Sequence, residues 1–257
     1  MTDFQRNFQK TSAKPRLGFV GFGGFGQLAA RHLAPYFRLC AYDTARANSV
    51  VLAEPDVTFV DLNTIALCDI VVLAVPVSEI RNSCLKLAPL LRPGAIVVDV
   101  GSVKVAPISD MIECLPEHVQ IIGTHPLFGP QSAANGLSGL KLSLCPVRGD
   151  AWRSLRVFLR RSLGLRVYTC SANQHDRDAA TVQGLTHLIA KVLTDLGPLP
   201  TDMTTASFDL LMQAVSMVKD DPPSVLHAIE TANPYASEVR AAFFAKAAKL
   251  SAQFDPQ

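Results

Sequence analysis

The chain has 257 residues, of which 49% are hydrophobic and 18% charged, and its 24 basic and 22 acidic side chains leave a formal charge of +2. This length fits one large domain or two unequal ones, and so small a charge argues against a nucleic-acid partner. No apolar run reaches the roughly 18 residues of a membrane span, and the six cysteines form no C-x-x-C pair, so we expect neither a membrane segment nor a metal site.

The first part of the chain, residues 1–15, is predicted to be a flexible tail. It is polar and mildly basic, and it lacks the apolar stretch of a secretory signal. The scattered cysteines fit reduced thiols, which are typical of the cytosol. We therefore expect a cytoplasmic protein.

Short apolar runs alternate with helical stretches over residues 16–171. Strands are predicted at 16–20, 38–42, 69–75, 95–100 and 119–123, and further strands at 142–147 and 166–170 flank a helix at 152–163. Apolar runs without polar alternation are typical of parallel strands that are covered on both faces. The pattern predicts an α/β fold in which an N-terminal Rossmann-type, doubly wound sheet forms the larger domain.

The hydrophobic pattern of the sequence changes after residue 171, and no strand-like apolar run follows. Helices are predicted at 173–196, 203–219, 223–231 and 234–253, and prolines stand near their starts and stops. Residues 172–257 are therefore expected to form a smaller, all-helical C-terminal domain.

A glycine-rich turn follows the first predicted strand. In a dinucleotide fold, Gly21 makes the tight turn, Gly23 lets the backbone approach a pyrophosphate, and Gly26 permits close packing of helix on strand. We expect the whole turn to bind the cofactor through Gly21, Phe22, Gly23, Gly24, Phe25 and Gly26.

An acidic residue, Asp43, ends the next predicted strand, 22 residues after Gly21. A carboxylate there accepts hydrogen bonds from the ribose hydroxyls and repels a 2′-phosphate, which favours NAD. Arg46 lies nearby and would soften this preference, so NADP remains an alternative, and a plain turn residue is the other interpretation of Asp43. Val75 and Pro76 end a later strand; they either line the cofactor cleft or simply terminate the strand.

A histidine and a serine follow the later strands. Ser102 comes after the strand at 95–100 and His125 after the strand at 119–123, so both are expected at the nicotinamide end of the crevice. Histidine suits general-base catalysis because its ordinary pKa lies near neutral pH, and a serine hydroxyl can orient its ring.

With these motifs the sequence resembles the prephenate and arogenate dehydrogenases of tyrosine biosynthesis, particularly the short plant-like arogenate type. The motifs that carry the resemblance are GFGGFGQ at 21–27, DVGSVK at 99–104, THPLFGPQSAANG at 124–136, HDRDAA at 175–180 and QGLTH at 183–187. The resemblance implies an NAD(P)-dependent oxidative decarboxylation that turns a cyclohexadienol into a phenol. It also implies a homodimer formed through the helical domain.

The resemblance assigns roles to individual residues. His125 would deprotonate the substrate's 4-hydroxyl or accept a hydrogen bond from it, with Ser102 positioning that group. Lys104 would place the ring carboxylate, or would be a solvated surface lysine. Gln183 and His187 match family positions that close over the substrate, although His187 alone would be interpreted as a core histidine. Asp176 matches an acid for which a structural role is favoured.

The choice of substrate depends on residues near 220. The arginine with which many prephenate-specific relatives hold a carboxylate is missing near Ser216, and Asp220 and Asp221 lie close by. An acid at Asp221 would pair with the ammonium of arogenate, which favours that substrate, unless these residues merely start a turn. The alternatives are a prephenate dehydrogenase that forms 4-hydroxyphenylpyruvate, a β-hydroxyacid-type dehydrogenase, and a module that binds NAD without turnover.

Overall fold

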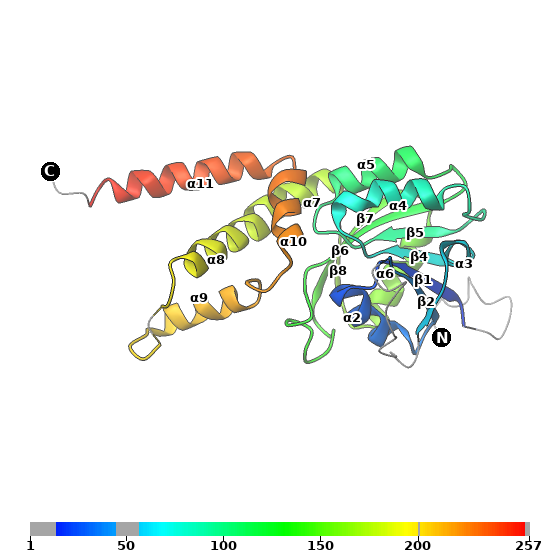
Figure 1. Ribbon diagram of the computed structural model, residues 1–257, viewed down its shortest axis with the longest axis horizontal. Coiled ribbons are helices and arrows are strands. Elements are labelled where there is room, and N and C mark those ends of the chain that lie inside the picture. Colours follow the sequence, from blue (N-terminus) through cyan, green and yellow to red (C-terminus); the bar gives the residue numbers. More distant parts are fainter. Residues whose placement is uncertain (1–13, 45–56, 200, 255–257) are drawn as a thin grey trace. The chain divides into compact units, whose positions relative to one another are not determined.

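The computed structural model describes residues 14–44, 57–199 and 201–254, and the chain forms two compact units with their boundary in the sequence between Ala172 and Asn173 (Figure 1). Most of the expected tail, and Arg46, lie outside the described residues. The last two residues of that tail belong to the fold instead. Lys14 Nζ donates to the Ala34 carbonyl at 3.0 Å, and the carbonyl of the buried Pro15 accepts from Arg38 N at 2.9 Å.

The first unit contains an eight-stranded sheet in the order β3-β2-β1-β4-β5-β6-β7-β8 within the described residues. The first six positions of this order are parallel to one another, whereas β7 is antiparallel to β6 and β8 is parallel to β7. The order 3-2-1-4-5-6 is that of a doubly wound dinucleotide-binding sheet, and its direction of winding reverses between β1 and β4. The predicted fold class is confirmed. The strands are β1 (Arg16–Val20), β2 (Arg38–Tyr42), β3 (Val57–Phe59), β4 (Ile70–Leu73), β5 (Ile96–Asp99), β6 (Gln120–Pro126), β7 (Lys141–Arg148) and β8 (Arg166–Thr169).

Helices cover both faces of this sheet (Figure 1). On one face, α2 (Gly24–Leu33) and α6 (Ala151–Arg161) pack on side chains such as Phe19 and Val72. On the other, side chains such as Leu73 pack against α3 (Leu62–Ala66), the 3₁₀ turn η1 (Val77–Glu79) with α4 (Ile80–Leu87), and α5 (Val105–Cys114). Burial on both faces explains why the central strands are apolar without alternation.

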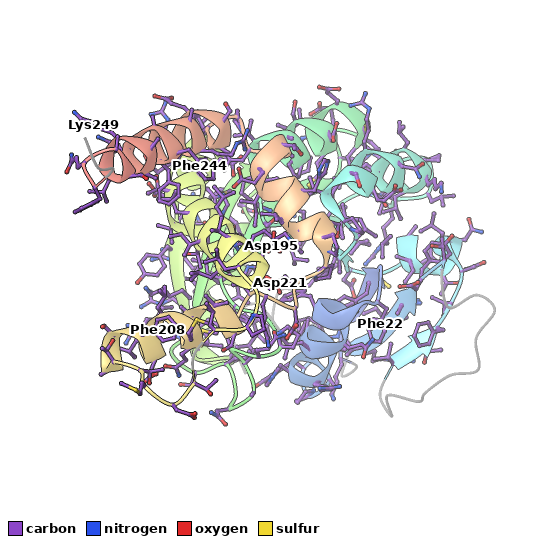
Figure 2. The ribbon with its side chains drawn as sticks, turned by 60° about the vertical axis from the view of Figure 1, so that its left-hand side comes forward. Phe22, Asp195, Phe208, Asp221, Phe244 and Lys249 are labelled. Atoms are coloured by element: carbon purple, nitrogen blue, oxygen red, sulfur yellow. The ribbon has the colours of Figure 1, made fainter. Side chains whose placement is uncertain are left out.

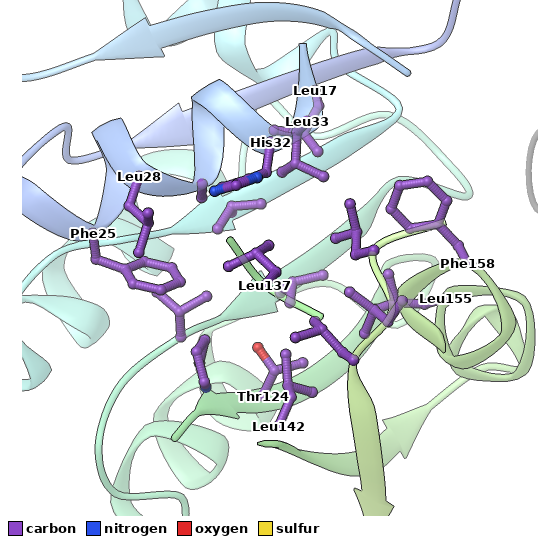
Figure 3. A pocket seen from close by; sticks show the side chains of 18 of the residues that line it. Leu17, Phe25, Leu28, His32, Leu33, Thr124, Leu137, Leu142, Leu155 and Phe158 are labelled. Carbon is purple, nitrogen blue, oxygen red and sulfur yellow. The ribbon is translucent and has the colours of Figure 1, made fainter. Parts of the chain in front are cut away.

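A small cavity remains in the layer between the sheet and the helices α2 and α6 (Figure 3). Its volume is about 100 Å³, and among its lining residues only His32 and Thr124 have polar side-chain atoms. Such an apolar cavity offers few hydrogen-bond partners to a water molecule, which needs several when it is buried. We interpret it as a packing feature and not as the chemical site.

The second unit contains helices and no strand among its described residues. It contains α7 (Ala172–Ala179), α8 (Leu185–Asp195), α9 (Ala206–Ser216), α10 (Pro223–His227) and α11 (Ala236–Ser251). Two wide π turns, η2 (Ala180–Gly184) and η3 (Ala228–Ala232), interrupt this series. They pack on each other at Gly184, where a side chain would begin 3.3 Å from Glu230 Oε1.

Candidate active site

The glycine turn between β1 and α2 has the geometry of a phosphate cradle. Gly21 has a φ of +86°, and a Cβ there would lie 2.6 Å from the Ala74 carbonyl oxygen, so no other residue fits. A Cβ at Gly26 would come within 3.2 Å of the Gly21 oxygen, which explains the close approach of the helix. A Cβ at Gly23 would meet nothing within 4 Å.

The start of α2 is open toward an anion. Its N-cap is Gly23, which offers no side-chain cap, and its first turn contains no acidic residue. Backbone N–H groups at such a helix start attract a phosphate. The residues at this turn therefore fit the pyrophosphate of a dinucleotide.

The other predicted cofactor residues lie beside the turn. Asp43 Oδ2 accepts a hydrogen bond from Phe22 N at 2.7 Å, which fixes the carboxylate at the glycine turn. Val75 lies two residues after the end of β4, and its Cγ1 is 2.8 Å from the Cβ position at Gly21. Pro76 is the N-cap of the 3₁₀ turn η1. These residues gather at the carboxyl ends of β1, β2 and β4, at the switch point of the sheet, where ligands of open α/β folds bind.

His125 lies on β6, and Ser102 lies in the loop after the neighbouring strand β5, at the same edge of the sheet. In the sheet register Asp99 of β5 pairs with Gly123 of β6; Ser102 follows three residues after the former and His125 two residues after the latter. His125 is 6% exposed, and Ser102 is half-buried. The strand was predicted to end at 123, but β6 continues to Pro126 because the antiparallel strand β7 extends its ladder and places Ser143 opposite His125.

Lys104 does not lie where the sequence placed it. Its side chain is fully buried, and Nζ donates to Asp99 Oδ2 and, at 2.7 Å, to the Thr124 carbonyl. Both interpretations made from the sequence, a ligand of the substrate carboxylate and a solvated surface lysine, are corrected by this burial. The ammonium faces the interior because Asp99 ends β5 pointing into the unit and compensates the charge.

In the helical unit, three predicted substrate residues form one hydrogen-bonded group. His187 Nδ1 lies 2.9 Å from the Gln183 carbonyl oxygen, and His187 Nε2 lies 3.2 Å from Asp221 Oδ2. Both partners are acceptors, so the ring makes both hydrogen bonds when both nitrogens are protonated. Asp221, labelled in Figure 2, lies between α9 and α10, and its side chain is 29% exposed.

The motif at 175–180 is tied into the helical unit. His175 Nδ1 lies 2.7 Å from Asp176 Oδ1, and both residues are buried. Asn233 Nδ2 donates to the Asp176 carbonyl at 2.8 Å, while Asn233 Oδ1 accepts from Tyr235 N at 2.9 Å. These contacts agree with the structural role expected for Asp176.

Known proteins match the chain in sequence and in fold. Residues 35–185 match the family model described as "Prephenate dehydrogenase, nucleotide-binding domain". Arogenate dehydrogenase 2, chloroplastic, of Arabidopsis thaliana is 30% identical over 251 residues, covering 92% of this chain and 69% of that protein. The chain belongs to the prephenate dehydrogenase family. The resemblance seen in the sequence is confirmed, and with it the class of enzyme, a dehydrogenase.

Further relatives of this prephenate dehydrogenase family member extend the comparison. Arogenate dehydrogenase 1, chloroplastic, of Arabidopsis thaliana is 29% identical, covering 87% of this chain but only 37% of that protein. The crystal structure of prephenate dehydrogenase from A. aeolicus in complex with hydroxyphenyl propionate and NAD+ superposes with a TM-score of 0.73 at 22% identity, covering 95% of this chain and 91% of that one. The family match disfavours the alternative of a β-hydroxyacid-type dehydrogenase.

Two polar residues of the family member's first unit were given no role from the sequence. Asp99 was quoted only as part of a motif, and its five-residue spacing to Lys104 was the available signal for an ion pair. Ser143 had no signal, because its position opposite His125 depends on the register of β6 and β7. Among the described residues, no cluster of three His, Cys, Asp or Glu side chains suits a metal ion, and no helix is long and apolar enough to cross a membrane.

Proposed function

We propose that this family member is an NAD-dependent arogenate dehydrogenase, which converts arogenate to tyrosine and CO₂ by oxidative decarboxylation. The observation that carries the proposal is the shared sheet edge, where the glycine turn, Asp43 and Ser102 follow the parallel strands β1, β2 and β5 and His125 lies near the end of β6. Prephenate, which would give 4-hydroxyphenylpyruvate, is the second candidate substrate, since the solved relative is a prephenate dehydrogenase.

The glycine turn and Asp43 would hold the cofactor. The turn, with Gly21, Phe22, Gly23, Gly24, Phe25 and Gly26, would bind the pyrophosphate, and Val75 and Pro76 would line the cleft. Asp43 favours NAD because a 2′-phosphate would meet its negative charge. Bound there, a nicotinamide dinucleotide accepts a hydride.

The chemistry at the substrate falls to His125 and Ser102. A ring nitrogen of His125 accepts the proton of the 4-hydroxyl, which pushes electron density toward C4 and the departing hydride. Loss of the ring carboxylate as CO₂ then leaves its bonding electrons in the ring, which becomes a phenolate and takes the proton back from His125. The Ser102 hydroxyl orients the substrate oxygen, and the near-complete burial of His125 keeps bulk water from this proton.

The helical unit would supply substrate contacts through Gln183, His187 and Asp221. Gln183 Oε1 is buried and has no hydrogen-bond partner among the described residues, so it offers an acceptor. Asp221 accepts from His187 with one oxygen and remains partly exposed. A carboxylate suits the ammonium of arogenate, whereas the keto acid of prephenate brings no positive charge.

The assembly we propose is a homodimer formed through the helical unit, and the compartment is the cytoplasm. Apolar side chains stand exposed at the C-terminal end of α8 and on α9 and α11, among them Leu196, Leu210 and the Phe244 labelled in Figure 2. Contiguous apolar patches are typical of interfaces, and in the proposed dimer these side chains lie at the interface. The compartment is supported by the six free cysteines, which suit a reducing environment.

The proposal is tested by following NADH or NADPH formation with arogenate and with prephenate, each with NAD and with NADP. We expect turnover with arogenate and NAD, and a fall of about 10²- to 10⁴-fold in kcat for His125→Asn while NAD binding is retained. Activity with prephenate alone would overturn the role of Asp221 but keep the mechanism. If protein that binds NAD shows no activity with either substrate, the result would favour a module that binds NAD without turnover.

A further inference from the structure

Beneath the proposed catalytic pair lies a buried ion pair, Asp99 with Lys104. Both side chains are fully buried. Lys104 Nζ donates to Asp99 Oδ2 and to the Thr124 carbonyl. Asp99 Oδ2 also accepts from Gly101 N at 3.0 Å, and Thr124 Oγ1 donates to the Asp99 carbonyl at 2.6 Å.

These hydrogen bonds join the chain segments that carry the proposed catalytic residues Ser102 and His125. Gly101 directly precedes Ser102, and Thr124 directly precedes His125. The ion pair thus connects the end of β5, the loop that follows it, and β6. A displacement of either charge would shift the backbone next to Ser102, next to His125, or both.

A buried ion pair of this kind contributes little net stability to a fold. Desolvation of two charges commonly cancels their attraction, and an apolar replacement of both is often neutral or stabilising. Burial raises the pKa of Asp99, although the charge and hydrogen bond of Lys104 oppose this shift. Asp99 Oδ1 has no hydrogen-bond partner among the described residues, so the carboxylate is only partly compensated.

Close packing nevertheless holds the carboxylate in one place. A Cβ at Gly123 would lie 2.8 Å from Ile108 Cδ1 and 3.4 Å from Asp99 Oδ1, so the strand beside Asp99 has no room for a side chain. The Asp99–Lys104 pair contributes little stability, yet it is held rigidly between the segments that carry Ser102 and His125. This indicates that the pair serves to fix the geometry of those segments and not to stabilise the fold.

We propose that Asp99 and Lys104 are positioning residues for the dehydrogenase reaction: they fix the backbones of Ser102 and His125 relative to each other. This inference rests on the proposed function. Neither side chain touches the substrate, because both are buried beneath the site. Their loss therefore acts on the chemical step, where a misplacement of about 1 Å can cost about 100-fold in rate, and leaves the glycine turn untouched.

The test is the double variant Asp99→Asn with Lys104→Met, which removes both charges at similar volume. A single replacement would leave the other charge buried without its partner and would destabilise the protein strongly. We expect the double variant to keep the wild-type melting temperature and an NAD Kd within about two-fold, while kcat falls by about 10- to 100-fold. The matched control is Asp69→Asn with Arg92→Met, an ion pair at the start of β4, for which kcat should stay unchanged.

A second variant covers the case in which the double variant does not fold. Thr124→Val deletes one of the bonds between β5 and β6 without touching either charge, and it should lower kcat by about 3- to 10-fold at unchanged melting temperature. An unchanged kcat in a folded double variant, or in Thr124→Val if the double variant does not fold, would overturn the inference.

A readout without substrate separates this inference from the proposed function. The ring resonances of His125, assigned in isotope-labelled protein with His125→Asn, should move in the double variant and stay in place in the Asp69 and Arg92 control. A wild-type enzyme that turns over neither substrate would refute the proposed function alone. Unmoved His125 resonances in the double variant would refute the positioning role alone.

Discussion

Gly21 and Gly23 lie two residues apart in one turn, yet their surroundings differ. Gly21 has a positive φ and touches the backbone of Ala74, so its lack of a side chain serves the fold. Gly23 has an ordinary φ of −72° and open space beside it, so its lack of a side chain serves only an approaching ligand.

These two glycines give a matched pair of variants. Gly21→Ala should lower the free energy of unfolding by about 1–3 kcal/mol, because the backbone is strained and the methyl group collides with a carbonyl. Gly23→Ala should leave stability within about 0.5 kcal/mol but weaken NAD binding by about ten-fold or more, a loss of about 1.4 kcal/mol. Thermal unfolding and NAD titration check both. Equal NAD affinity for Gly23→Ala and the wild type would contradict the role of the turn.

A buried thiol makes stability depend on pH. Burial raises the pKa of Cys84 to about 12 from its ordinary value near 9. The folded protein therefore keeps a proton that the unfolded chain releases, so this contribution to stability is complete below about pH 9 and is lost as the pH rises toward about 12. Cys84→Ala should flatten that decline in urea unfolding across this range, whereas Ser83→Ala, which removes a half-buried hydroxyl of the same helix and no thiol, serves as the control.

At the scale of elements, Asn233 joins α7 to the beginning of α11. Its amide bonds the Asp176 carbonyl and Tyr235 N, and it is buried. Asn233→Ala leaves two backbone groups without these partners, so we expect a loss of about 1–3 kcal/mol in unfolding free energy. Asn173→Ala, which removes an exposed bond to the Tyr235 hydroxyl, should cost no more than about 0.5 kcal/mol. Equal losses in denaturant unfolding would contradict the assignment.

Elements of the sheet differ in how far the sequence defines them. The strands β1 and β2 have the predicted bounds, because apolar runs with no alternation mark a doubly covered sheet. The elements β3 and α3 were not predicted, because three and five residues are too few to show a hydrophobic period. The one local signal for α3 is Asp61, whose side chain caps the helix by accepting a hydrogen bond from Thr64 N. The π turns were also missed, because hydrophobic spacing does not separate a wide turn from an α-helix.

The site residues likewise divide into those that the sequence predicts and those that it does not. Gly21, Asp43 and His125 stand beside motifs with a fixed spacing, and the sheet order brings them to one edge. The burial of Lys104 was not predictable, because nothing in the linear sequence shows that Asp99 points inward at the end of its strand. Ser143 depends on a pairing between β6 and β7 that no local pattern contains.

At the scale of the whole molecule, the exposed apolar side chains of the helical unit predict its association state. We expect the purified chain to be a dimer by light scattering, and Leu196→Lys with Leu210→Lys to make it a monomer, because two charges would be desolvated at the interface. Both leucines are 67% exposed. Leu85→Lys on α4 of the first unit, where the leucine is 56% exposed, is the control and should remain a dimer. A monomeric wild-type chain would refute the dimer.

The wide turn η2 sets the rotational phase of everything that follows it in the helix. A π turn holds about one residue more than an α turn, and each residue advances a helix by about 100°. Because the wide turn holds its additional residue within one turn, α8 keeps the phase it would have without that residue, whereas the same residue in regular α geometry would rotate α8 by about a quarter turn. Deleting a single codon within residues 180–182 would therefore let this stretch close into a regular α-helix with α8 still in phase with α7. His187 would then keep its alignment with Asp221 although the chain is one residue shorter. Relatives of different length in this turn should accordingly be compared by helical phase and not by residue count alone.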